Sequence, residues 1–176
     1  MLRIILLLTV LCVGSPFEAR LFGQAIPSPV APAAIAAAID EEVGRIVSGS
    51  ILQTAKTTYL EGYGVVVTIE VAFERPRNPF SAPRDPDVVR QSSEMRRAEL
   101  KEMAVELLGQ HLSAFDGLDS NDQVTIVIYM LNTNPADLPD LPTQIVVSAR
   151  KQDGADLRSA AISQAVFADR VTIREY

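Results

Sequence analysis

Residues 57–73, TTYLEGYGVVVTIEVAF, carry the clearest alternation of apolar and polar positions in the chain. From Val65 to Phe73 every odd-numbered side chain is apolar, whereas the even-numbered positions include Thr68 and Glu70. An alternation with a period of two is typical of a strand that buries one of its faces. We therefore predict a strand over residues 65–73 with its odd-numbered side chains in the core.

Two other segments repeat their apolar positions every three or four residues, which is the period of a helix with one buried stripe. The first runs from residue 35 to about residue 56, although Gly49 weakens it because a glycine inside a helix costs about 1 kcal/mol relative to alanine. The second runs from residue 85 to about residue 114. It begins with Asp85, which can cap the free amide groups, and Pro86, which suits the first turn.

The last third of the chain contains the remaining predicted strands. Residues 124–131 are apolar on both faces, as expected of a central strand. Residues 143–150 form another strand, and a weak helical stretch over 153–168 precedes a short strand over 171–175. The predicted order is helix, strand, helix, strand, strand, short helix, strand. Helix stripes and strand faces of this kind cover one another, so we expect an α+β fold of two layers, with a mixed four-stranded sheet covered by two long helices.

Gly62 and Gly64 lie on either side of Tyr63, just before the first predicted strand. Phosphate-binding loops place their glycines after a strand and before a helix, so that backbone amides at the helix N-terminus face the ligand. Here the predicted order is the reverse, because a helix comes before the glycines and a strand after them. This order favours a simple turn into the strand over a ligand-binding loop.

The first 25 residues have the three regions of a secretory signal peptide, with Arg3, an apolar run and a polar segment that ends at Ala25. The apolar run is about ten residues long, whereas a membrane span needs about twenty. We expect cleavage after Ala25 and export to the periplasm or the extracellular space, with an uncleaved tether as the alternative. Residues 26–34 hold three prolines and are expected to be a linker, followed by a single domain over 35–176.

Composition and charge narrow the class of protein. Cys12 is the only cysteine and lies in the predicted leader, so the mature chain is expected to fold without a disulfide. About 150 mature residues are enough for an ordinary apolar core. The formal net charge of −6 disfavours nucleic acids and anionic lipids as partners, because an acidic surface repels phosphate groups.

Few residues suit catalysis or metal binding. His111 is the only histidine, and its place on an apolar helix stripe favours a core or boundary position over a catalytic one. The oxygen-rich turn at 116–122 lacks the glycine and the late glutamate of a calcium loop, and a zinc site lacks ligands. Glu70 and Glu74 lie about 13 Å apart on a strand, too far for a glycosidase pair, and are expected to face solvent. We predict no catalytic residue, metal or cofactor.

The proline-rich segment 74–87 contains the candidate partner-binding residues. These are Arg75, Arg77, Phe80 and Arg84. Arginine and aromatic side chains are frequent anchors of protein interfaces, and prolines lower the entropy lost on binding. We expect this segment to contact a partner, and a solvated connection between two elements is the simpler alternative.

Three functional hypotheses follow from these patterns. The first is an exported, non-catalytic module that acts through contacts with another extracytoplasmic protein. The second is a small hydrolase whose catalytic residues are dispersed along the chain, since active sites assemble in space. The third is a small-ligand-binding protein that uses Tyr59, Glu61 and Tyr63. A deep pocket with converging polar groups would favour the second or third, whereas an exposed apolar patch would favour the first.

Overall fold

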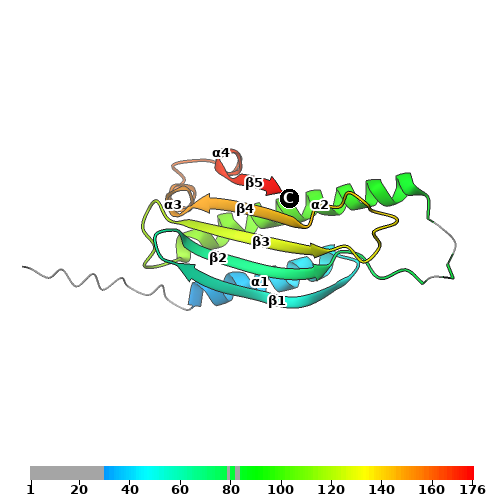
Figure 1. Cartoon of the computed structure of the whole chain (residues 1–176). Helices are drawn as coiled ribbons and strands as arrows, with labels where there is room; N and C mark the ends of the chain where they lie inside the picture. Colours follow the sequence, from blue (N-terminus) through cyan, green and yellow to red (C-terminus); the bar gives the residue numbers. More distant parts are fainter. Residues whose placement is uncertain (1–29, 79, 82–83) are drawn as a thin grey trace, which may run out of the picture.

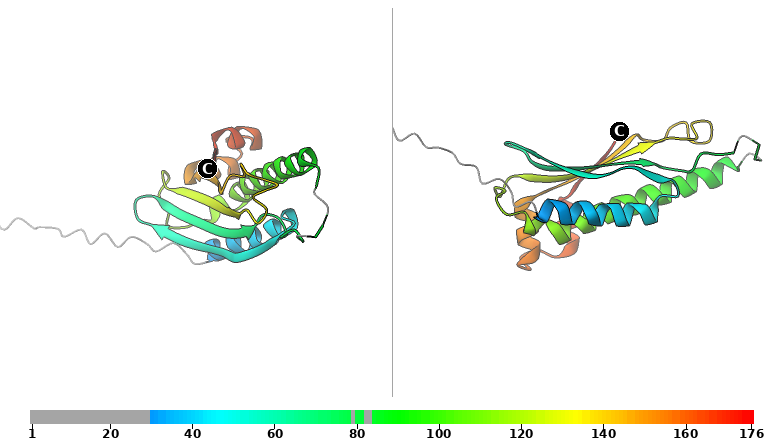
Figure 2. Two further views of the ribbon diagram at one scale, coloured as in Figure 1. Left: turned by 45° about the vertical axis from the view of Figure 1, so that its right-hand side comes forward. Right: turned by 90° about the horizontal axis from the view of Figure 1, so that it is seen from below.

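The computed structural model describes residues 30–78, 80–81 and 84–176, which form two layers (Figure 1). One layer is a five-stranded sheet, and the long helices α1 and α2 cover one of its faces (Figure 2). The elements are α1 (Val30–Ile46), β1 (Ser50–Leu60), β2 (Gly64–Ala72), α2 (Pro86–His111), a 3-10 turn (Leu112–Ala114), β3 (Gln123–Leu131), β4 (Gln144–Arg150), α3 (Lys151–Arg158), α4 (Gln164–Arg170) and β5 (Thr172–Glu175). No helix in these ranges is long and apolar enough to cross a membrane.

The strands lie in the sheet in the same order as in the sequence, from β1 to β5. Only β2 and β3 are parallel among the described strands, and the other neighbours are antiparallel. A parallel pair cannot be joined by a hairpin, so α2 provides the connection between β2 and β3. The class α+β and the mixed sheet are confirmed. The described residues form five strands instead of the predicted four, together with four α-helices.

The core lies between the sheet and the two long helices. The odd-numbered side chains of β2 are at most 1% exposed from Val65 to Val71, which confirms the predicted face. From α1, Ile35, Ile39 and Val43 are fully buried against this face. The remaining fully buried core residues of α2, β3 and β4 are Leu100, Ala104, Leu108, Val124, Ile126, Ile128, Ile145 and Val147.

The predicted helix over 35–56 is wrong in its second half, because α1 ends at Ile46 and the edge strand β1 begins at Ser50. Gly49 marks the change of structure. A Cβ atom on Gly49 would lie 1.7 Å from the carbonyl oxygen of Ala72, so only glycine allows the chain to pass this close to the end of β2. At its other end α1 begins at Val30, so the last residues of the expected 26–34 linker are helical.

The start of α2 was predicted correctly. Asp85 accepts a hydrogen bond from the backbone amide of Asp87 at 2.9 Å, and Pro86 occupies the first turn. The predicted helix over 153–168 is instead two short helices, α3 and α4. Ala160 interrupts it with a left-handed backbone (φ 57°), and Ser163 then caps α4 by accepting a hydrogen bond from the amide of Val166.

Gly62 lies in the hairpin turn between β1 and β2 and Gly64 is the first residue of β2, with φ values of 74° and 125°. Both lie in the region that favours glycine. The glycines therefore form a turn, as predicted, although a strand precedes them in place of a helix. The predicted signal peptide over 1–25, with Cys12, and the first residues of the linker lie outside the described residues.

Candidate functional site

A buried carboxylate connects the proline-rich segment to α2. Glu74 is 4% exposed, and the expectation that it faces solvent is wrong. Its two carboxylate oxygens accept hydrogen bonds from Arg84 Nη1 at 2.8 Å and from Arg96 Nη1 at 2.7 Å. A charge removed from water needs such partners to be tolerated. The predicted binding residue Arg84 therefore stabilises the buried Glu74.

The other two arginines of the segment are also engaged within the chain. Arg75 Nε donates to the carbonyl oxygen of Ser48 at 2.8 Å, which ties the segment to the connection between α1 and β1. Arg77 Nη1 donates to Asp137 Oδ1 at 3.1 Å, and its backbone amide donates to Asn134 Oδ1 at 3.0 Å. These contacts hold the segment against the loop that follows β3.

Phe80 differs from the arginines because its side chain is 96% exposed. Its backbone amide donates to Asn78 Oδ1 at 3.0 Å, and the amide and hydroxyl groups of Ser81 donate to the carbonyl oxygen of Asn78. A local turn therefore presents the aromatic ring to solvent. Among the four predicted partner-binding residues, the three arginines make side-chain contacts within the chain, whereas the Phe80 side chain is almost fully exposed.

The residues proposed for a small ligand do not converge. Tyr59 pairs with Val65 across the hairpin, so its side chain lies on the helix-covered side of the sheet. The hydroxyl group of Tyr63 instead contacts Thr125 Oγ1 at 2.6 Å on the opposite side. Glu61 lies in the exposed turn between the two strands. These three residues therefore do not form one pocket.

The described residues show few of the side-chain groupings that a hydrolase active site or a metal site needs. They contain no group of three or more histidine, cysteine, aspartate or glutamate side chains that could hold a metal ion. Thr125 and Ser148 form a hydroxyl chain with Tyr63, but His111 lies at the end of α2, beneath the other face of the sheet. Burial lowers the pKa of His111 below its usual value of 6.5, as expected of a boundary histidine.

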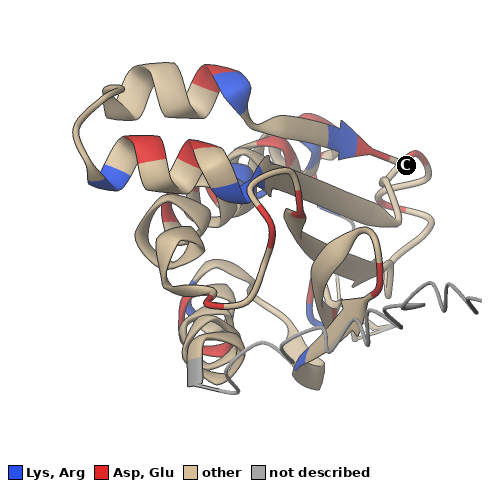
Figure 3. Cartoon of the chain, turned by 90° about the vertical axis from the view of Figure 1, so that its left-hand side faces the viewer, with Lys and Arg blue, Asp and Glu red and all other residues tan. Residues whose placement is uncertain are grey.

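The face of the sheet opposite the helices, here called the uncovered face, carries apolar side chains such as Val127 and Val146 among polar ones such as Glu70 and Thr125. The strand register places Thr68, Val127 and Val146 side by side across β2, β3 and β4. Charged side chains continue this row at both edges, with Lys56 on β1 and Arg174 on β5. In Figure 3 most charged residues lie on helices and loops, and much of the strand ribbon carries none.

Large apolar side chains remain exposed at one end of the uncovered face. Tyr129 is 40% exposed and Leu131 is 56% exposed. Both belong to β3, where the strand leads into the loop that contacts the proline-rich segment through Arg77. At the far edge, a hydrogen bond from Arg174 to the hydroxyl group of Tyr176 is the main cause that raises the pKa of Arg174.

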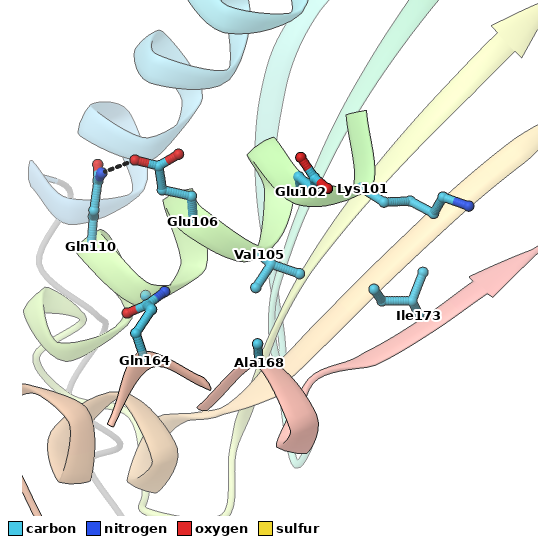
Figure 4. Close-up of a pocket in the computed structure, with 9 residues that line it drawn as sticks. Lys101, Glu102, Val105, Glu106, Gln110, Gln164, Ala168 and Ile173 are labelled. Atoms are coloured by element: carbon cyan, nitrogen blue, oxygen red, sulfur yellow. Dashed lines mark hydrogen bonds between the residues drawn. The ribbon is translucent and has the colours of Figure 1, made fainter. Parts of the chain in front are cut away.

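A cavity of about 630 Å³ lies on the helix side of the sheet, between α2, α4 and β5 (Figure 4). We call it the α2–α4 groove. Its apolar lining consists of Val105, Gly109, Ala168 and Ile173. Its polar lining consists of Lys101, Glu102, Glu106, Gln110 and Gln164. None of the residues predicted from the sequence as a binding site lines this groove.

The sequence pattern held only a weak sign of the groove. A weak helix over 153–168 and a strand over 171–175 were predicted, but the position of α4 and β5 beside α2 follows from packing across the whole domain. Comparisons with protein-family models, with curated proteins and with solved structures found no match.

Proposed function

We propose that the protein is an exported, non-catalytic module that acts through contacts with another protein outside the cytoplasm. The observation that supports this most directly is the composition of the uncovered face. A sheet face that only meets water usually alternates to polar residues, whereas Val66, Val127 and Val146 occupy outward positions here. Outward apolar side chains mixed with polar ones such as Thr68 and Glu70 are the composition found in many protein interfaces.

The exposed anchors add to this proposal. Tyr129 and Leu131 are large side chains that gain free energy when a partner removes them from water. Phe80 is a further exposed aromatic side chain, on the proline-rich segment that leaves the sheet where the Phe73 amide donates to the Leu131 carbonyl oxygen. A hydrolase would need a nucleophile, a base and an orienting acid that converge, whereas the hydroxyl chain through Thr125 and Ser148 lies on the opposite side of the sheet from His111.

Site-specific photo-cross-linking tests the contact surface. A photoreactive phenylalanine analogue in place of Tyr129 should give an adduct with one protein in cells that naturally produce the chain. The same analogue in place of Ala98, an exposed residue of α2, should not give that adduct. Adding Leu131→Glu to the Tyr129 variant should reduce the adduct about tenfold, because a carboxylate replaces an apolar anchor.

The variants at positions 129 and 98 must both stay folded for their adducts to be compared. Both positions are exposed, so the variants are expected to stay folded, with unchanged circular dichroism spectra. Equal adducts from the two positions, no adduct from either, or an adduct that Leu131→Glu leaves unchanged would each count against the uncovered face as the contact surface.

Cleavage of the predicted signal peptide tests export separately. When the full chain is expressed in a bacterial host, we expect the protein outside the cytoplasm with its N-terminus near Ile26, because signal peptidases cut after small residues such as Ala25. N-terminal sequencing of the purified protein provides the measurement. Recovery of the uncleaved chain from the cytoplasm would contradict both the compartment and a mature form without cysteine.

A further inference from the structure

We propose that β5 and the α2–α4 groove bind an extended peptide segment of another protein, which adds as a strand to β5 and places one apolar side chain in the groove, followed on the same side by two basic ones. This site lies on the helix side of the sheet, since Ile173 pairs with the buried Val147 of β4. It is therefore separate from the uncovered face, and either site could exist without the other.

The outer edge of β5 provides the backbone partners. Tyr176 and Gln144 exchange hydrogen bonds, with the Tyr176 amide 3.1 Å from the Gln144 oxygen and the Gln144 amide 3.2 Å from the Tyr176 oxygen. Antiparallel strands alternate between residues that bond inward and residues that bond outward. The amide and carbonyl groups of Ile173 and Glu175 therefore point away from β4, at the edge of the described sheet.

The groove begins directly beside these outward groups. The side chain of Ile173 is 42% exposed and lines the groove, so one residue contributes both an edge backbone and an apolar wall. Val105 of α2 and Ala168 of α4 provide the other apolar walls (Figure 4). The volume of about 630 Å³ lies within the usual range of binding pockets, about 300 to 1,000 Å³.

The backbone groups favour an extended peptide over a helix. A helix satisfies its own amide and carbonyl groups, so it could not use those of Ile173 and Glu175. An added strand pairs with these groups and sends every second side chain toward the groove. In this kind of recognition, main-chain hydrogen bonds provide the affinity, and the pocket that receives a side chain provides the specificity.

The charge of the polar residues around the α2–α4 groove indicates which side chains the bound peptide should carry. Glu102 and Glu106 are exposed, lie one helical turn apart on α2 and line the groove. Glu102 forms no ion pair among the described residues, and Glu106 accepts only a hydrogen bond from Gln110 at 3.0 Å. The one basic residue of the rim, Lys101, is paired with Glu175 at 3.0 Å. The rim is therefore acidic and suits lysine or arginine.

The spacing also fits an extended segment. Four helical residues separate Glu102 from Glu106, a rise of about 6 Å along α2. Side chains two residues apart on a strand are about 6.6 Å apart. Arg97 and Lys101 of α2 both pair with Glu175, and Val105 lines the groove together with Ile173, so α2 runs alongside β5. Neighbouring same-side positions of an added strand can therefore meet successive carboxylates.

A synthetic peptide of about seven residues, Thr-Leu-Thr-Lys-Thr-Lys-Thr, tests the site by nuclear magnetic resonance titration of the purified protein. Its two lysines and its leucine lie on one side of an extended chain. We expect the amide resonances of Ile173 and Glu175 and the methyl groups of Val105 to shift, while those of Val127 on the uncovered face stay unchanged. No shift at β5 or in the groove at millimolar concentration would overturn the proposal.

Two altered peptides separate the parts of the proposal. Replacing both lysines by glutamate should abolish the shifts, because the rim is acidic. Methylating alternate backbone nitrogens of the lysine peptide should also abolish them, because strand addition needs those amides. Unchanged binding of the glutamate peptide would refute the charge preference, and unchanged binding of the methylated peptide would refute strand addition.

Two matched variants of the protein locate the charge effect. Glu102→Lys should weaken the lysine peptide about fivefold, in line with the energy of exposed ion pairs. Glu99→Lys makes the same change on an exposed residue of α2 that does not line the groove, and it should have little effect. Equal weakening by the two variants would show general attraction to an acidic protein instead of a site.

Discussion

Replacing Ile69 by lysine should unfold the domain, whereas lysine at the neighbouring Thr68 should leave it folded. Ile69 is 1% exposed and faces the helices from the centre of β2, so its replacement buries an unpaired ammonium group. Such burial costs several kcal/mol, which is comparable to the whole stability of a small domain, about 5–15 kcal/mol. Thr68 faces the uncovered side, where the new side chain can reach water.

Urea denaturation followed by circular dichroism measures this difference. Thr68→Lys should cost about 1 kcal/mol or less, mainly through repulsion from Lys56, which lies opposite on β1. Because both variants add the same side chain to adjacent positions of one strand, strand propensity cannot account for a difference between them. Equal unfolding midpoints would show that the assignment of the two sheet faces is wrong.

Replacing Gly64 by alanine should destabilise the domain by about 3 kcal/mol or more. Its φ of 125° is rarely open to other residues, and a Cβ atom there would lie 2.1 Å from the carbonyl oxygen of Gln123. That oxygen belongs to the backbone at the start of β3, so no side-chain rotation relieves the overlap. The contact lies where β2 and β3 begin side by side, and relief requires the strands to move apart.

Gly62 provides the matched control, two residues away in the same turn. It also has a positive φ, 74°, but a Cβ atom there would meet nothing within 4 Å. Gly62→Ala should therefore cost only the conformational penalty, about 1–2 kcal/mol. Urea unfolding of the two variants compares the penalties, and a smaller loss for Gly64→Ala than for Gly62→Ala would contradict the close approach of the strands.

Sequence patterns predicted the elements whose signals are local. The alternation from Val65 to Val71 identified the buried face of β2, because the face of each side chain follows from the strand period alone. The cap at Asp85 identified the start of α2 in the same way, since a side chain and an amide two residues away form it.

The edge strand β1 was missed because its signal depends on a distant partner. No residue of Ser50–Leu60 is fully buried, so the apolar pattern is weak, and Ile51 continued the three-to-four spacing of α1 by coincidence. What makes this segment a strand is pairing with β2, along with its β-branched residues such as Thr57. Gly49 was visible as a helix-weakening residue, and the helix does end before it.

In the candidate sites too, features that depend on neighbouring residues could be predicted, whereas features that depend on distant residues could not. The exposure of Phe80 follows from its proline-rich surroundings, and the structure places it in solvent. The arginines could not be assigned from sequence, because the partners of Arg75 and Arg77 lie 27 and 60 positions away in the chain. The α2–α4 groove was also beyond local patterns, since three separate elements create it.

The parallel pairing of β2 with β3 determines how the domain can fold. The β1–β2 hairpin closes through a short turn, and antiparallel pairing of this kind can form early. In contrast, β2 reaches β3 only after residues 73–122, including all of α2, have been brought across the sheet. Closing a long segment costs conformational entropy before its contacts form, which slows folding. The two antiparallel parts of the sheet are therefore expected to join late, when α2 docks.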